Sequence, residues 1–231
     1  MKDDYWKAFW AEHARTTAYQ DIQSQVLRTL NKAPISKAQF QKILKEIEGK
    51  MEICTNDEVL DLCCGNGVIT KYLASKCKRV VGVDFVPELV AQIDLKKHPN
   101  ICCIVEDARK VDFNKQSFDK IIIYAGLQYL SYKETIYLFD SVVRWLKSGG
   151  LFYIGDIPDR ERRWNFFNTD ERERAYFDSI KNEKPVVGTW FESEWLIKLG
   201  RYTSFKDVEI LQQSKGLPYA HYRFGMVLKK S

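Results

Sequence analysis

The sequence lacks any apolar run long enough to cross a membrane. No stretch approaches the roughly 20 consecutive apolar residues that span a bilayer as a helix. The N-terminal segment MKDDYWKAFWAEHAR is charged from its second residue onward and has no apolar centre of the kind found in secretory signals. We therefore expect a cytoplasmic protein that does not interact with a membrane.

Histidine is scarce, and the cysteines are not arranged as metal ligands. The chain has three histidines and six cysteines but no C-x-x-C motif. Two cysteine pairs are adjacent, Cys63–Cys64 and Cys102–Cys103, and neighbours in a strand point to opposite faces of the sheet. Such pairs make poor joint ligands for zinc, so we expect no bound metal and reduced, buried thiols.

Internal repeats, low-complexity tracts and Pro/Gly/Ser-rich linkers are also missing. Of the 231 residues, 45% are hydrophobic and 29% are charged, which is typical of a globular protein. The net charge of +5 is spread along the chain instead of being concentrated in one patch. This distribution favours a solvated, lysine-rich surface over a nucleic-acid interface.

After residue 50 the sequence alternates regularly between strand and helix patterns. Nearly all-apolar segments such as KIIIY at 120–124 are typical of strands buried on both faces. Strands are predicted at 58–62, 80–84, 101–106, 120–124 and 151–155, with helices at 68–76, 87–97 and 133–146. This order predicts an α/β fold with a Rossmann-like, doubly wound, mostly parallel sheet.

The segments on either side complete the predicted architecture. Aromatic residues at helical spacing, from Tyr5 to Trp10, indicate an N-terminal helical lid over residues 1–50. In the main domain, 51–231, a polar stretch at about 159–184 predicts a helical insertion. A helix at 192–199 then precedes strands at 206–212 and 221–229, which we expect to form a C-terminal antiparallel hairpin and to bring the sheet to seven strands.

A glycine-containing turn follows the first strand of this alternation. Gly65 and Gly67 come shortly after Asp61 and directly before a helix, so a ligand can approach the backbone and an anion can bind the helix start. Asp84 ends the second strand, where a carboxylate can accept both ribose hydroxyls. Asp107 follows the third strand and can accept a hydrogen bond from an adenine amino group.

The spacing of the glycines disfavours other nucleotide-binding classes. A G-x-G-x-x-G motif beginning at Gly65 requires a third glycine where Thr70 stands, and one beginning a step earlier requires glycine at Cys63. The P-loop signature with its Gly-Lys-Ser/Thr is absent. A dehydrogenase is therefore the less favoured interpretation.

The turn belongs to a series of five segments, which read DLCCGNG, VVGVDF, VEDARKVDF, FDKIIIYAGLQYL and LKSGGLFYIGDIP. In this order and spacing, the stretch 59–158 resembles the class I (Rossmann-like) S-adenosylmethionine-dependent methyltransferases, whose sheet also ends in an antiparallel strand pair. Cys63 stands where that family often has glycine. The outer segments DIQSQVLRT, GTWF and LPYAHYRF are similar to bacterial small-molecule methyltransferases of surface-polysaccharide and related tailoring genes.

The resemblance implies S-adenosylmethionine as the cofactor and assigns residues to its parts. The methionine part is expected at Asp61, Cys63, Gly65 and Gly67, with Tyr124 beneath its end. The ribose and adenine are expected at Asp84, Phe85, Asp107 and Ala108. The alternative is that Asp84 and Asp107 are ordinary strand-end or turn residues and that Cys63 and Phe85 only pack against their neighbours.

The acceptor is expected at the carboxyl ends of the fourth and fifth strands, beneath the N-terminal helices. The predicted catalytic residues are Tyr124, Gln128, Tyr129, Asp156 and His221. Further candidates for the lining are Tyr5, Trp6, Trp10, His13, Tyr19, Tyr222 and Arg223. Gln128 stands where many relatives have histidine, so it is expected to hydrogen-bond the acceptor. The alternatives are a chain-turning role for Asp156, a surface position for His221 and a core role for the Trp6–Trp10 stripe.

These observations predict an enzyme that transfers a methyl group from S-adenosylmethionine to O or N of a small polar acceptor, such as a sugar or a phosphorylated molecule. A general base is useful when the acceptor is a hydroxyl and optional when it is an amine that deprotonates easily. One alternative is an RNA or other nucleic-acid methyltransferase, although the base-amino signature N/D-P-P-Y/F is replaced by YAGLQY. The other is a non-catalytic protein that binds S-adenosylmethionine. The sequence does not predict the oligomeric state.

Overall fold

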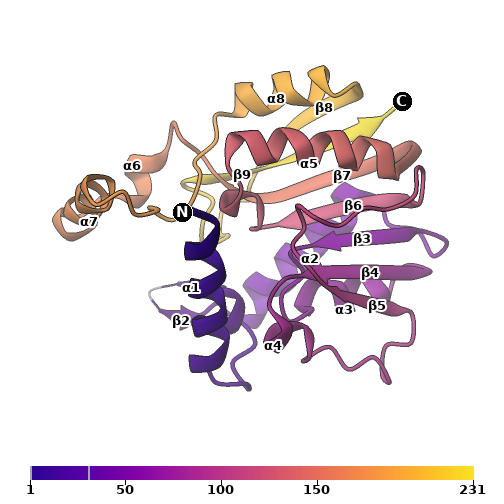
Figure 1. Cartoon of the computed structure of the whole chain (residues 1–231), viewed down its shortest axis with the longest axis horizontal. Coiled ribbons are helices and arrows are strands. Elements are labelled where there is room, and N and C mark those ends of the chain that lie inside the picture. Colours follow the sequence, from indigo (N-terminus) through magenta and orange to yellow (C-terminus); the bar gives the residue numbers. More distant parts are fainter. Residues whose placement is uncertain (1, 31) are drawn as a thin grey trace.

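The computed structural model describes residues 2–30 and 32–231; Met1 and Asn31, both within the predicted lid, lie outside the described residues. Its centre is a seven-stranded sheet in the order β5-β4-β3-β6-β7-β9-β8 (Figure 1). The strands are β3 (Glu58–Leu62), β4 (Arg79–Asp84), β5 (Ile101–Val105), β6 (Phe118–Tyr124), β7 (Leu146–Pro158), β8 (Phe205–Gln212) and β9 (Arg223–Lys230). β9 runs antiparallel to both β7 and β8, and the other pairs are parallel. The predicted Rossmann-like sheet with its C-terminal antiparallel hairpin is confirmed.

Helices cover both faces of this sheet (Figure 1). α5 (Tyr132–Trp145) and α8 (Ser193–Tyr202) pack on one face, and α2 (Lys37–Met51) and α3 (Val68–Ala74) pack on the other. Along β6, Ile121 and Ile123 belong to the first layer and Ile122 to the second, and all three are fully buried. Burial on both faces is the physical reason for the all-apolar KIIIY segment.

Side chains that bond the backbone determine where several helices begin and end. Ser36 forms a capping box with Gln39 at the start of α2, and Ser131 forms one with Glu134 at the start of α5. The helix predicted at 87–97 is in fact α4 (Pro87–Val90), and residues 91–97 form turns. There the Asp94 carboxylate accepts hydrogen bonds from the backbone N–H groups of the residues at 96 and 97, which competes with helical bonding.

The N-terminal segment is helical only in part, whereas separate helical segments were predicted over 1–50. α1 (Lys2–Thr16) is helical, but the residues that follow contain a 3-10 turn, η1 (Ser24–Val26), and a two-stranded ribbon of β1 (Thr29–Leu30) and β2 (Ala33–Pro34). Leu27 adopts a left-handed φ of 52°, which a helix does not accommodate. Because α2 belongs to the sheet core, α1 and residues 17–30 form the part that lies over the carboxyl edge of the sheet.

The stretch predicted as an insertion contains α6 (Arg163–Phe166) and α7 (Asp170–Lys181). Neither helix has a buried residue, and both project away from the sheet at the left of Figure 1. Within residues 2–30 and 32–231, no helix is long and apolar enough to cross a membrane.

Candidate functional site

A cavity of about 1030 Å³ lies at the carboxyl edge of the sheet. Its lining comes from the ends of β3, β4, β6 and β7, from the start of β9, and from α1 and the segment around Arg28. β3 is the first strand of the sheet in chain order. The chain adds β4 and β5 on one side of it and then crosses over to β6 on the other side, so the strand order reverses at β3. Open α/β sheets bind ligands at such a switch point.

The glycine turn forms one wall of this cavity. Gly65 and Gly67 both adopt positive φ, at 55° and 74°, and Gly67 directly precedes α3. A Cβ atom at Gly65 would lie 2.9 Å from Val26 Cγ1, and one at Gly67 would lie 2.6 Å from Ile93 Cγ1. Gly65 borders the cavity, whereas the cavity lining does not include Gly67. The second glycine is therefore required for the turn and its packing, and the first also leaves room for a ligand.

Asp84 is fixed at the end of β4. Its carboxylate accepts hydrogen bonds from the backbone N–H of Gly65 at 2.9 Å and of Val86 at 3.0 Å. Burial raises the pKa of Asp84, and these N–H groups act in the opposite direction. Each oxygen has a further lone pair, so the carboxylate can still accept hydrogen bonds from a ligand in the cavity.

Asp107 lies further along the same wall and is held by cations. Arg109 donates from Nε at 2.8 Å and from Nη2 at 2.5 Å, and Lys7 of α1 forms an ion pair at 3.5 Å. Burial alone would raise the pKa of Asp107, but the hydrogen bonds and charge of Arg109 outweigh it and lower the pKa to about 2. Asp107 is therefore an ionised acceptor at neutral pH, and its ion pair with Lys7 links α1 to this wall.

Asp61 has the opposite electrostatic character. Its carboxylate is buried and accepts a hydrogen bond from the Thr70 hydroxyl at 2.7 Å. Burial raises the pKa of Asp61 to about 7 despite this bond. The group therefore changes its charge close to neutral pH.

Three adjacent strands end in a strained residue at this edge. Cys63 after β3, Ala125 after β6 and Asp156 near the end of β7 have φ values of 59°, 56° and 61°. Left-handed backbone is costly for residues other than glycine and is concentrated at functional sites. The φ of Cys63 also explains why glycine suits this position. Burial raises the pKa of the Cys63 thiol well above its usual range, so the thiol is not a nucleophile at neutral pH.

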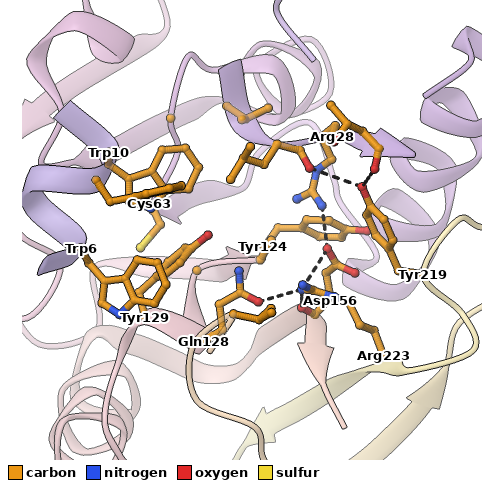
Figure 2. Close-up of a pocket in the computed structure, with 18 of the residues that line it drawn as sticks. Trp6, Trp10, Arg28, Cys63, Tyr124, Gln128, Tyr129, Asp156, Tyr219 and Arg223 are labelled. Carbon is orange, nitrogen blue, oxygen red and sulfur yellow. Dashed lines mark hydrogen bonds and ion pairs between the residues drawn. The ribbon is translucent and has the colours of Figure 1, made fainter. Parts of the chain in front are cut away.

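Aromatic side chains roof the cavity. Trp6 and Trp10 of α1 pack edge-on against Tyr129, at centroid distances of 4.8 and 5.6 Å (Figure 2). Burial raises the pKa of Tyr129 to about 12, so its phenol stays protonated at neutral pH. Tyr5 also borders the cavity, whereas the cavity lining includes neither His13, whose Nε2 lies 2.9 Å from the Ser24 carbonyl, nor the exposed Tyr19.

Opposite this roof, two arginines meet Asp156. Arg28 Nη1 lies 2.6 Å and Arg223 Nη1 3.5 Å from the same carboxylate oxygen of Asp156 (Figure 2). Gln213 donates to the other oxygen at 2.9 Å. Arg223 also donates to Gln128 Oε1 at 2.9 Å. Arg28 was not among the predicted site residues. It lies in the segment DIQSQVLRT, and no local pattern indicates that it reaches Asp156 across 128 residues.

His221 lies at the exposed rim of the cavity, just before β9 begins at Arg223. Burial lowers its pKa, and the positive charges of Arg172 and Arg162 act in the same direction, so the imidazole is neutral near neutral pH. Arg172 also borders the rim, while Arg162 is paired with Asp159 at 2.6 Å.

The structure brings nearly all the predicted site residues to one cavity. It is bordered by Asp61, Cys63, Gly65, Asp84, Phe85, Asp107, Ala108, Tyr124, Gln128, Tyr129, Asp156 and His221, with Gly67 as the exception. Their individual roles in binding or catalysis stay predictions.

The family comparison bears on the same part of the chain. A family model described as a methyltransferase domain matches residues 59–150. Over these residues the chain is similar to methyltransferase domains. The matched stretch contains the glycine turn, Asp84, Asp107 and Tyr124, so the predicted enzyme class is confirmed for this stretch.

Similar proteins include an uncharacterised methyltransferase of Schizosaccharomyces pombe, 29% identical over 119 residues, which cover 48% of this chain and 44% of that protein. Ribosomal RNA small subunit methyltransferase A of Clostridium botulinum is 32% identical over 93 residues, or 38% of this chain and 34% of that protein. The chain thus spans less than half the length of these relatives.

Among solved structures, phosphoethanolamine N-methyltransferase 1 of Haemonchus contortus, in complex with phosphoethanolamine and S-adenosylhomocysteine, superimposes with a TM-score of 0.71 at 18% identity. The match covers 99% of this chain and 48% of that chain. At this identity the likeness shows the fold. The finer resemblance to polysaccharide-tailoring enzymes stays a prediction.

Proposed function

We propose that this chain transfers the methyl group of S-adenosylmethionine to an oxygen or nitrogen of a small polar acceptor. The observation that carries the proposal is that one cavity joins two chemically different ends. The first end has the glycine turn and the carboxylates of Asp84 and Asp107, and the second has Gln128, Asp156 and Arg223. Its volume is at the upper end of the roughly 300–1,000 Å³ typical of small-molecule sites, which suits two ligands bound side by side.

The first end fits the cofactor by its own chemistry. Asp84 keeps lone pairs for the ribose hydroxyls, and Gly65 presents no side chain to the ligand. At Asp107, Oδ1 already accepts two hydrogen bonds from Arg109, so the acceptor for the adenine amino group is Oδ2, which also faces Lys7. Phe85 and Ala108 offer apolar surface beside them. When bound, S-adenosylmethionine supplies a methyl group already activated by its positively charged sulfur.

The chain's own task is then to align the acceptor with that methyl group and to exclude water. Tyr124 is buried and lies between the two ends of the cavity, and Trp6, Trp10 and Tyr129 pack together beside the first end (Figure 2). Burial raises the pKa of Tyr124 and Tyr129, so neither hydroxyl removes a proton from the acceptor at neutral pH. Gln128 does not titrate, which leaves His221 at the rim as the neutral base among the predicted catalytic residues.

Calorimetric titration with S-adenosylhomocysteine tests the cofactor part of the proposal. The wild-type protein is expected to bind it, and Asp84→Asn is expected to weaken binding by about tenfold or more, because a hydrogen bond to a charged group is lost. Asp140→Asn changes an exposed aspartate of α5 outside the cavity lining and serves as the control. Wild-type protein that binds NADH instead of S-adenosylhomocysteine would contradict the proposal.

Mass spectrometry of a panel of small acceptors, incubated with the protein and S-adenosylmethionine, tests the reaction. The expected result is the gain of one methyl group by an acceptor with a hydroxyl or amine. Methylation of RNA, with none of the small acceptors modified, would replace this proposal by the nucleic-acid alternative.

A further inference from the structure

Two buried arginines share one buried aspartate at the second end of the cavity. The exposed fractions of the side chains are 6% for Arg28, 8% for Arg223 and 2% for Asp156. Arginine is always protonated in proteins, and the pKa of Asp156 is lowered by these two cations although burial acts to raise it. The three side chains, here called the arginine cluster, therefore carry one net positive charge away from bulk water.

The phenols around the cluster do not cancel this charge. The surrounding phenols of Tyr124, Tyr219 and Tyr222 have pKa values raised by burial, so they remain neutral. Glu46 of α2 borders a separate, smaller cavity behind Asp156 and accepts a hydrogen bond from Ser214. Burying an uncompensated charge is unfavourable, and a protein without a ligand for it gains nothing from keeping it there.

The remaining cavity carboxylates belong to other places. Asp61, Asp84 and Asp107 lie on the walls formed by β3, β4 and the loop after β5, and the lining residue Glu171 lies on the projecting α7. The net positive charge is therefore localised at the end formed by β7 and β9.

Both guanidinium groups are held in position and border the open cavity. Arg28 lies over the ring of Tyr124 at 4.4 Å from its centroid. The Arg223 guanidinium lies beside the neighbouring rings of Tyr219 and Tyr222, 5.5 and 5.3 Å from their centroids, and donates to the Asp156 carbonyl at 2.8 Å. Its buried Nε has no hydrogen-bond partner within the described part of the chain. A fixed, planar cation with an unused donor is suited to an anionic group with several oxygens.

We propose that the arginine cluster binds an anionic group, a phosphate or a carboxylate, carried by the acceptor. This inference rests on the proposed function and specifies its substrate class: the acceptor has a hydroxyl or amine at one end and a negative charge at the other. Gln128, which is bonded to Arg223, joins the cluster to the place of transfer.

The position of the cluster favours the acceptor over the cofactor's own carboxylate as the source of the anion. Asp156 and Arg223 come from β7 and β9, whereas Asp84 and the glycine turn lie at β4 and β3 on the other side of β6. Figure 2 shows the same separation, with Cys63, Trp10 and Tyr129 on one side of Tyr124 and Arg28, Asp156 and Arg223 on the other.

The test is calorimetric titration of inorganic phosphate into protein saturated with S-adenosylhomocysteine. Wild-type protein is expected to bind phosphate. Arg223→Gln and Arg28→Gln are each expected to weaken that binding by about 10- to 100-fold, the usual effect of losing a charge-assisted hydrogen bond, and to leave the affinity for S-adenosylhomocysteine unchanged. Arg201→Gln, on the exposed end of α8, is the matched control and is expected to bind phosphate as wild type does.

The variants Arg223→Lys and Arg28→Lys keep the positive charge and serve as a second test if a glutamine variant does not fold. They are expected to lose less affinity for phosphate than the glutamine variants do. Thermal unfolding confirms that each variant is folded. Phosphate binding that is absent, or unaffected by the cluster variants, would overturn the proposal. Competition between phosphate and S-adenosylhomocysteine, or loss of S-adenosylhomocysteine binding in Arg28→Gln, would assign the cluster to the cofactor and also overturn it. A wild-type protein that binds phosphate at the cluster but not S-adenosylhomocysteine would instead contradict the proposed function.

Discussion

Replacing Asp156 by asparagine tests whether the arginine cluster is the strained electrostatic centre that its geometry indicates. Asparagine has the same shape as aspartate and tolerates left-handed backbone, so the φ of 61° at this position remains accessible. The substitution therefore removes the charge and leaves one accepting oxygen in place of two, so either Arg28 or Gln213 also loses its hydrogen bond. Arg28 and Arg223 are then left as two buried cations without a carboxylate between them.

The size of the effect follows from burial. Removing one partner of a buried ion pair destabilises a protein by about 3–5 kcal/mol, because the remaining charge is neither solvated nor paired. In a chain of this length each kcal/mol corresponds to about 2–4 °C in Tm, so Asp156→Asn is expected to lower Tm by about 6 to 20 °C. The 2.6 Å contact with Arg28 and the hydrogen bond from Gln213 place the expectation in the upper part of this range.

Urea unfolding followed by tryptophan fluorescence measures the loss, with Asp140→Asn as the exposed control. Burial alone would raise the pKa of Asp156, but Arg223 and Arg28 lower it below its ordinary value of 3.8. The stabilisation by this carboxylate is therefore complete above about pH 4 and is lost only as the pH falls through the lowered pKa. The difference in the free energy of unfolding between wild type and Asp156→Asn should be constant from pH 5 to 8. A difference of less than about 1 kcal/mol would refute the buried-charge reasoning.

Three further predictions concern the cofactor half and its border. Because burial raises the pKa of Asp61 to about 7, the free energy of unfolding of the wild-type protein should fall by up to about 4 kcal/mol as the pH rises from 4 to 7. Urea unfolding of Asp61→Asn should show no such pH dependence, and the same dependence in the variant would contradict the prediction. Gly65→Ala, strained by its positive φ and by contact with Val26, should weaken S-adenosylhomocysteine binding at least about tenfold by calorimetry, and unchanged affinity would argue against ligand approach at this turn. In Gly155→Ala the new Cβ would overlap the Tyr124 ring, so thermal unfolding should show a loss of about 1–3 kcal/mol, and a neutral effect would mean that the ring is free to move.

The cofactor half of the cavity could be predicted because its determinants are local in sequence. Each of Asp61, Asp84 and Asp107 ends or follows a strand whose apolar pattern is evident, and parallel strands bring these ends to one edge of the sheet. The glycine turn is short, so its spacing alone distinguishes it from a dinucleotide motif. Even Gly67, which the cavity lining does not include, is required for the turn on which that wall depends.

The N-terminal segment shows where sequence patterns are insufficient. Ile22, Val26 and Leu30 have helical spacing, yet the chain there forms a turn and a short ribbon. Contacts with distant parts of the fold fix this conformation: the Asn66 side chain donates to the Ile22 carbonyl and to Gln25, and the Tyr219 hydroxyl bonds the Thr29 carbonyl. Such tertiary contacts override local propensity and leave no periodic signal.

The acceptor end could be predicted only in part for the same reason. Gln128, Asp156 and Arg223 were candidates, whereas Arg28 and the contacts among the four side chains were not predicted. The unfavourable features that these contacts combine argue that this end is a ligand site. Arg28, Gln128, Asp156 and Arg223 come from four segments that meet only in the fold. Each feature here is unfavourable by itself: a left-handed φ at Asp156, a net buried charge, and an arginine Nε without a partner. A structural tether between the N-terminal segment and the sheet would be stronger with one arginine and one aspartate. An anion bound beside Arg28 and Arg223 explains why both are present, because its negative charge would balance the positive charge that Asp156 alone does not neutralise.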